Sequence, residues 1–297
     1  MKTLLAAVLL LCAAAPSASA QTELKLGHVG SPGSLFALSA DEFAKRVKEK
    51  TKGKVVVTVF GSSQLGDDTE MMQKVKLGTL DMTLPSTVMS SLVPAYGLFE
   101  MPYLVRDRDH MKRIEKEIVW PTLAPLAEKS GYKVIAVWEN GFRQITNNAH
   151  PIKVPEDLRG IKLRVALQTG VMDGEENPLT QIYTAKFQEV QKFLSMTDHV
   201  YTPAYLVVSV RKWASLPADQ RKAVEEAAKE TQPFVYENGA KMDKDLLGKI
   251  KEAGVKVNDA DKAAFQKASK PVYDEFGKEV PNGKEMIDKA LALGQSK

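Results

Sequence analysis

The chain has 297 residues, of which 41 are Lys or Arg and 37 are Asp or Glu, so its formal charge is +4 at pH 7. Lysines and acids alternate instead of forming blocks, so this weakly basic balance does not favour nucleic-acid binding. A single cysteine excludes a disulfide framework within the chain.

The first 20 residues are predicted to be a secretion signal. Lys2 supplies the positive start, residues 4–15 the apolar core, and residues 18–20 a small-residue cleavage site. The apolar run is too short to span a bilayer, and Cys12 is not preceded by a small residue, which disfavours lipoprotein processing. Cleavage after Ala20 removes the only cysteine, which excludes a cysteine nucleophile and a cysteine-based zinc site. We expect the mature protein in the periplasm.

The first half of the mature chain alternates strand and helix signals. The predicted strands are residues 24–28, 55–60 and 80–84, and the predicted helices are residues 35–51 and 69–77. This alternation is typical of a mostly parallel α/β sheet, which binds ligands beyond the carboxyl ends of its strands. Those ends are residues 28–34, 61–66 and 85–90.

The second half is predicted to contain longer elements. Strands are expected at residues 133–139, 142–147, 161–165 and 201–209. The Gly-Glu-Glu-Asn-Pro segment at residues 174–178 is predicted to be a turn that leads into a helical segment. Residues 218–253 predict one helix, roughly 54 Å long at about 1.5 Å per residue, with a kink at Pro233. A helix of this length suggests a spine shared by two domains.

Short motifs follow one another along nearly the whole mature chain. They are KLGHV (25–29), FAKRV (43–47), QLG (64–66), GTLDM (78–82), GFRQ (141–144), PEDL (155–158), GIKLRV (160–165), ALQTG (166–170), DGEENP (173–178) and KFQEVQK (186–192). In this order and spacing, the chain resembles the solute-binding subunits of TRAP (tripartite ATP-independent periplasmic) transporters.

The resemblance implies an α/β, two-domain, periplasmic-binding-protein-like clam with crossing strands and a long interdomain helix. Domain one would be residues 21–140 plus 203–242, and domain two residues 141–202 plus 243–297. Relatives continue after the Lys-x-Arg-Val motif with a loop, a helix and a strand. Here an internal deletion is expected between Val165 and Ala166, so domain two would be shortened by most of a βαβ unit, which takes roughly 30 residues.

Three residues match the family's positions for the ligand carboxylate. Arg164 would pair with it, because a guanidinium offers two parallel N–H donors. Arg143 matches a second arginine near the hinge, and Asn177 an asparagine that hydrogen-bonds the same carboxylate. The alternatives are a structural ion pair for each arginine and turn chemistry for the asparagine.

Further candidates lie at predicted strand ends and could bind the variable part of the ligand. They are His28, Ser31, Gln64, Ser86 and Thr87, for which loop capping is the alternative. Tyr201 and Tyr205 could wall the cleft, although aromatic residues on a strand more often belong to the core.

Enzyme chemistry has no support in the sequence. No nucleophile elbow, phosphate-binding loop, dinucleotide fingerprint or zinc-protease motif occurs, and the four histidines lack ligand spacing. Asp107, Asp109 and His110 could hold a cation, but a solvated turn is the stronger interpretation. We therefore expect no catalytic site, no cofactor and no metal site.

The sequence predicts an extracytoplasmic receptor that binds a small organic acid, closes by hinge motion and delivers it to the membrane permease subunits of a TRAP transporter. A monomer is expected. The identity of the acid stays open among sugar acids, dicarboxylates and aromatic acids. The alternative function is a degenerate or sensor-type relative that no longer supports transport because of the deletion in domain two.

Overall fold

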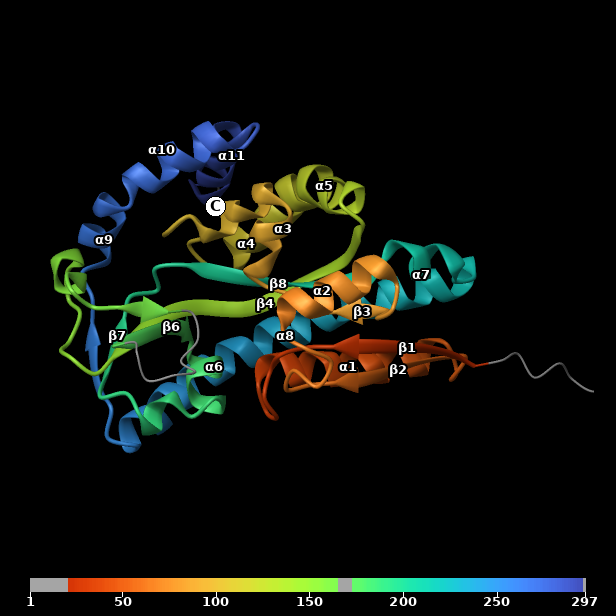
Figure 1. The fold of residues 1–297 in the computed structure, drawn as a ribbon, viewed down its shortest axis with the longest axis horizontal. Helices are drawn as coiled ribbons and strands as arrows, with labels where there is room; N and C mark the ends of the chain where they lie inside the picture. The colour runs from red at the N-terminus through yellow and green to blue at the C-terminus, as the bar shows by residue number, and fades with distance from the viewer. Residues whose placement is uncertain (1–20, 165–172, 296–297) are drawn as a thin grey trace, which may run out of the picture.

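The computed structural model describes residues 21–164 and 173–295, with Arg164 described in its backbone alone (Figure 1). The predicted signal segment and the expected deletion between Val165 and Ala166 lie outside the described residues. Within them, every helix is too short or too polar to cross a membrane.

One sheet carries the predicted parallel strands. Its order is β2 (Val55–Phe60), β1 (Thr22–Gly27), β3 (Met82–Thr83), β8 (Tyr201–Ser209) and β4 (Tyr132–Asn147). β1 pairs in parallel with β2 and β3, whereas β8 runs antiparallel to both of its neighbours. We call β1, β2, β3, β8 and residues 132–142 of β4 the first sheet.

β4 continues beyond residue 142 into a second set of pairings. Its residues 143–147 pair with β6 (Gly174–Pro178) and, over part of this length, with β7 (Phe193–Met196). β5 (Leu163–Arg164) lies beside β6, and β9 (Lys256–Asp259) lies beside β7. We call these strands with residues 143–147 the second sheet. A single strand, β4, therefore runs through both.

Helices cover both faces of the first sheet. α1 (Leu35–Lys50) and α8 (Ala218–Glu252) pack on one face. On the other are α2 (Asp68–Leu77), η1 (Pro94–Glu100), α4 (Arg108–Ile114), η2 (Glu115–Leu123) and α5 (Ala124–Lys129). The remaining helices are α3 (Val88–Leu92), η3 (Pro155–Leu158), α6 (Leu179–Thr184), η4 (Phe187–Glu189), α7 (Val210–Ser215), α9 (Lys262–Ala268), α10 (Lys270–Glu279) and α11 (Gly283–Gln295).

Two elements connect the surroundings of the sheets. α8 contacts α1 beside the first sheet and α6 beside the second, as expected for a shared spine. It continues through Pro233 as one helix. The C-terminal helices form an arch from the end that holds β7 back to α4, on which α11 packs (Figure 1).

Local sequence signals explain where the early helices begin and end. The Ser34 side chain accepts a hydrogen bond from the Ala37 amide at the start of α1. α2 begins with a reciprocal capping box between Asp67 and Glu70, and it ends at Gly78, whose φ of 80° is left-handed. The predicted bounds of α1 and α2 are thus right to within one residue.

The structure confirms the predicted bounds of β2 and β8 and differs from the other predicted strands in several places. The two strands expected between residues 133 and 147 are one strand, β4, with pairing irregularities near residues 135 and 140. The strand expected at 80–84 is reduced to β3. The turn expected at residues 174–178 was wrong: this segment is β6, because its backbone pairs with β4 and its polar side chains find partners inside the sheet.

Candidate functional site

A cavity of about 530 Å³ lies beyond the end of β3, beside the point where β4 passes between the sheets. Its lining combines hydroxyl side chains from the first-sheet side with a charged cluster from the second-sheet side. The lining residues are Thr87, Val88, Ser90, Ser91, Glu100, Arg143, Glu176, His199, Val200 and Thr202. The predicted residues Thr87 and Arg143, which are 56 positions apart in sequence, therefore share one cavity.

Arg143 is the first residue of the second sheet and is only 3% exposed. Its guanidinium donates two hydrogen bonds to the Glu176 carboxylate, from Nε to Oε2 at 2.5 Å and from Nη2 to Oε1 at 2.8 Å. Nη2 also donates to the Glu176 carbonyl and, at 3.2 Å, to Asn177 Oδ1. No described residue accepts a hydrogen bond from Nη1. A buried guanidinium thus retains N–H groups at the wall of a cavity.

Glu176 connects Arg143 to a histidine. His199 Nε2 lies 3.1 Å from Glu176 Oε2, and its Nδ1 lies 2.8 Å from Thr197 Oγ1. Burial opposes ionisation of Glu176, but the hydrogen bond with His199 and the charge of Arg143 outweigh it and hold the pKa below its usual range. The carboxylate is therefore ionised, and its hydrogen-bond partners Arg143 and His199 belong to the protein itself.

The neighbouring Glu175 points to the opposite face of β6, as alternation along a strand requires. It is fully buried and accepts hydrogen bonds from Thr146 Oγ1 and Asn177 Nδ2, both at 2.6 Å. Burial raises its pKa to about 7, against the effect of these bonds and of Arg143. Asn177 therefore links the two carboxyl groups of the Glu-Glu pair. It donates to Glu175 directly, and it accepts from Arg143, which in turn donates to Glu176.

Ser86 and Thr87 follow β3, as predicted. Thr87 lines the cavity, and Ser86 lines a small recess beside it that Thr87 and Glu100 share. The Ser86 hydroxyl donates to the Pro203 carbonyl at 2.7 Å, so it fixes the loop after β3 against β8. Glu100 accepts a hydrogen bond from Ser90 at 2.5 Å.

Besides Ser86 and Asn177, which lie next to it, four predicted residues do not line this cavity. Tyr201 is buried and donates to Glu139 at 3.3 Å, which places it in the core. His28 is 1% exposed, and burial lowers its pKa to about 4, so it is neutral at pH 7. Ser31 is half-buried and Gln64 is exposed. A ligand role for these four stays a prediction, and the side chain of Arg164 lies outside the described residues.

The sequence did not single out Glu176, His199 or Glu100 as site residues. Glu176 belongs to the recognised Glu-Glu-Asn-Pro motif, so that motif was the available signal. The sequence gives no signal for His199, because no second histidine lies at ligand spacing; in the structure it lies beside a carboxylate 23 residues away. Glu100 ends η1 in a stretch without any predicted element.

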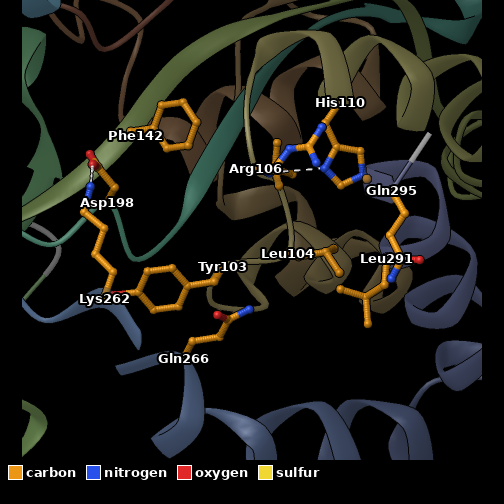
Figure 2. Close-up of a pocket in the computed structure, with 12 residues that line it drawn as sticks. Tyr103, Leu104, Arg106, His110, Phe142, Asp198, Lys262, Gln266, Leu291 and Gln295 are labelled. Carbon is orange, nitrogen blue, oxygen red and sulfur yellow. Dashed lines mark hydrogen bonds and ion pairs between the residues drawn. The ribbon is translucent and has the colours of Figure 1, made fainter. Parts of the chain in front are cut away.

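A second cavity, of about 550 Å³, lies under the C-terminal arch (Figure 2). Tyr103 and Arg106 line one side, Lys262 and Gln266 come from α9, and α11 closes a third side. Lys262 forms an ion pair with Asp198, the residue before His199. The segment at residues 198–199 therefore contributes to both cavities.

The charged loop that could have held a cation is a helix cap. Asp107 Oδ1 accepts a hydrogen bond from the His110 amide at 2.7 Å at the start of α4. Among the described residues, no three His, Cys, Asp or Glu side chains are grouped as metal ligands.

The family model described as bacterial extracellular solute-binding protein, family 7, matches residues 26–166 and 165–279. The two matches meet where the sequence predicts the deletion between Val165 and Ala166, and that deletion stays a prediction. The 2,3-diketo-L-gulonate-binding periplasmic protein of Escherichia coli K12 is 32% identical, over 93% of this chain and 94% of its own.

Solved structures of TRAP periplasmic solute-binding proteins share the fold over nearly the whole chain. One from Sulfurospirillum deleyianum, with bound succinate, is 35% identical with a TM-score of 0.86, covering 92% of this chain and 99% of its own. One from Polaromonas sp. JS666, bound to D-erythronate, is 30% identical with a TM-score of 0.87, covering 93% and 100%.

Proposed function

The chain belongs to family 7 of the bacterial extracellular solute-binding proteins, and from this we propose that it binds a small organic acid and delivers it to the membrane permease subunits of a TRAP transporter. The family consists of substrate-binding receptors that work with membrane components, and several of its relatives are named as periplasmic proteins. We further propose that this protein is a periplasmic monomer whose signal is cleaved after Ala20.

The observation that carries the proposal is Arg143 at the wall of the 530 Å³ cavity. Its Nη1 donors have no acceptor among the described residues, and charge-assisted bonds to a carboxylate are the strong ones. Asn177 and His199 lie around the same guanidinium. By the family resemblance, Arg164 would supply the bidentate contact to the same ligand group.

The opposite wall offers hydroxyl groups rather than cations. Thr87, Ser90 and Ser91 suit the hydroxyl or carbonyl groups of a ligand whose carboxylate lies near Arg143. A ligand bridging the two walls favours the closed state, because only differential contact with that state shifts the equilibrium. We propose domains of residues 21–140 plus 203–242 and 141–202 plus 243–297, which would close on it.

The test is thermal unfolding of residues 21–297 with D-erythronate, galactonate, glucuronate and succinate, acids of the kinds bound to structural relatives. An acid at 100 times its dissociation constant stabilises by roughly 2.7 kcal/mol, a shift of several degrees. A cooperative transition raised by one of these acids supports the proposal. A cooperative transition that none of them moves contradicts it and favours the degenerate or sensor-type alternative.

Substitutions of Arg164 then separate charge from geometry. Arg164→Ala is expected to abolish acid binding and leave the fold intact. Arg164→Lys is expected to lose most of the affinity, because an ammonium cannot form the two parallel bonds of a guanidinium. Calorimetry that finds unchanged affinity in the alanine variant would remove Arg164 from the site.

A further inference from the structure

Tyr103 comes from the first-sheet side of the molecule but packs on the second-sheet side. It lies in the loop between η1 and α4, both of which belong to the core on one face of the first sheet. Its ring packs against a small cluster beside the second sheet, formed by Ile145, Ile152 and Phe265. One partly buried aromatic side chain thus extends from one part of the molecule and packs against the core of the other.

The same residue makes two hydrogen bonds to one turn of the second-sheet side. Its backbone N–H donates to the His199 carbonyl at 2.8 Å. Its hydroxyl donates to the Thr197 carbonyl at 3.1 Å. The two carbonyls flank Asp198, so Tyr103 holds this turn at both ends.

Left-handed backbone occurs on both sides of this contact. Tyr103 has a φ of 61° and Asp198 a φ of 44°, a conformation that is uncommon for residues other than glycine and exceptional for a bulky one. Such residues persist where their surroundings over-determine them, and they cluster at ligand clamps and switch regions. Asp198 is held in turn by Gln144, whose Oε1 accepts from its N–H at 3.0 Å, and by the ion pair with Lys262.

The clamped turn orients the imidazole of the proposed site. The Thr197 hydroxyl lies 2.8 Å from His199 Nδ1, and His199 Nε2 reaches Glu176, which pairs with Arg143. Any shift of the turn therefore moves His199 relative to the carboxylate that engages Arg143.

We propose that Tyr103 is a positioning residue for the acid-binding site: it clamps the turn at residues 197–199 across the junction of the two sheets and so sets His199 against Glu176. This inference rests on the proposed function of the cluster. Figure 2 shows the Tyr103 ring beside Gln266 and Lys262 at the second cavity. Tyr103 does not line the cavity that holds Arg143. Tyr103 therefore acts through the turn and does not touch the acid.

The test compares Tyr103→Phe with Tyr273→Phe in the protein comprising residues 21–297. Tyr273 makes a bond of the same kind, from its hydroxyl to the Pro102 carbonyl at 2.6 Å, one residue before Tyr103. It has no contact with the 197–199 turn among the hydrogen bonds of the described residues. Affinity is measured by calorimetry with D-erythronate, galactonate, glucuronate and succinate. The His199 imidazole is observed by ¹H–¹⁵N NMR without any acid, with its signals assigned through His199→Gln.

Tyr103→Phe is expected to weaken acid binding about 2- to 10-fold, the equivalent of one hydrogen bond, and to shift the His199 imidazole signals. Tyr273→Phe should leave both unchanged. Tyr103→Phe with wild-type affinity and unmoved His199 signals overturns the inference, as does an equal effect of the two variants. If the wild type binds none of the four acids, the proposed function fails, and the NMR comparison alone still decides whether Tyr103 positions His199.

Discussion

The two sheets bury apolar and polar side chains in different proportions. In the first sheet most buried positions are apolar, such as Leu24 and Leu206, each 0% exposed, although Glu139 is a buried carboxylate that pairs with Arg108. In the second sheet, Glu175 is also 0% exposed and Arg143 is 3% exposed, and both depend on hydrogen bonds and charge. Burying a charge costs much more than burying a methyl group unless partners compensate. The first sheet thus gains more of its stability from the burial of apolar side chains, whereas the second depends more on hydrogen bonds and ion pairs between buried polar groups.

The sharpest way to break this comparison is to remove the charge at the start of the second sheet. Arg143→Ala removes a buried guanidinium and leaves the partly buried Glu176 carboxylate without its arginine partner, which is expected to cost about 3 kcal/mol of unfolding free energy. The control is Lys229→Ala in α8, which breaks an i,i+4 pair with Glu225 at the surface and should cost about 0.3–0.5 kcal/mol. Urea unfolding measures both. Similar losses would show that the Arg143 cluster is not a buried charge network.

A matched pair of leucines tests the apolar part of the comparison. Leu206 in β8 and Leu194 in β7 are both 0% exposed, but Leu206 belongs to an extensive core and Leu194 to a cluster of five buried residues. Leucine-to-alanine changes cost about 2–5 kcal/mol, depending on how far the site collapses. Leu206→Ala should lie near the upper end and Leu194→Ala near the lower. The reverse order in urea unfolding would mean that the smaller core is the more rigid one.

This difference also explains what the sequence could predict. Strands β2 and β8 were found to the residue because β-branched and apolar runs mark a buried strand. The polar segment Gly174–Pro178 matches the pattern of a turn and of no strand, since its burial depends on Thr146 and Arg143 from β4. A partner 30 positions away leaves no local signal. Family motifs indicated Arg143 and Asn177, whose role in ligand binding stays a prediction, and hydropathy indicated neither.

The connection between β5 and β6 is a second feature that local sequence patterns do not predict. These two strands pair in parallel, yet only residues 165–173 separate them. Parallel neighbours ordinarily need a crossover of about a dozen residues or more. The loss of a helix and a strand at this point, which the family motifs predict and periodicity alone does not, stays a prediction.

The buried Glu175 of the second sheet should make the stability of the protein depend on pH. Glutamate in an unfolded chain ionises near pH 4.3, roughly, whereas burial raises the pKa of Glu175 to about 7. Between these values the folded state holds a proton that the unfolded state has released, so stability falls as pH rises through this window, by at most about 1.4 kcal/mol per pH unit. Glu175→Gln should remove this slope. Thermal unfolding from pH 4 to 8 checks it, and parallel profiles of the two proteins would contradict it.

His28, which follows β1 in the first sheet, should give the opposite pH dependence of stability. Histidine in an unfolded chain titrates near pH 6.5, roughly, but burial lowers the pKa of His28 to about 4. Between these values the histidine binds a proton in the unfolded state but not in the folded state, so stability is lost as pH falls from 6.5 towards 4. At pH 7 this contribution of His28 vanishes. It is therefore smaller than the effects expected for Arg143, for the two leucines and for Glu175.

His28→Asn should remove that acid-side loss, because an amide does not titrate in this range. Thermal unfolding from pH 4 to 7 is the measurement, with His150→Asn as the control, since His150 is exposed and should leave the profile unchanged. The profile of His28→Asn should diverge from that of the wild type only below pH 6.5, and that of Glu175→Gln already at pH 7. If His28→Asn and Glu175→Gln changed the slope in the same direction, the buried histidine would have to be charged in the fold. The contrast between a mostly apolar first sheet and a charged second sheet would then fail at β1.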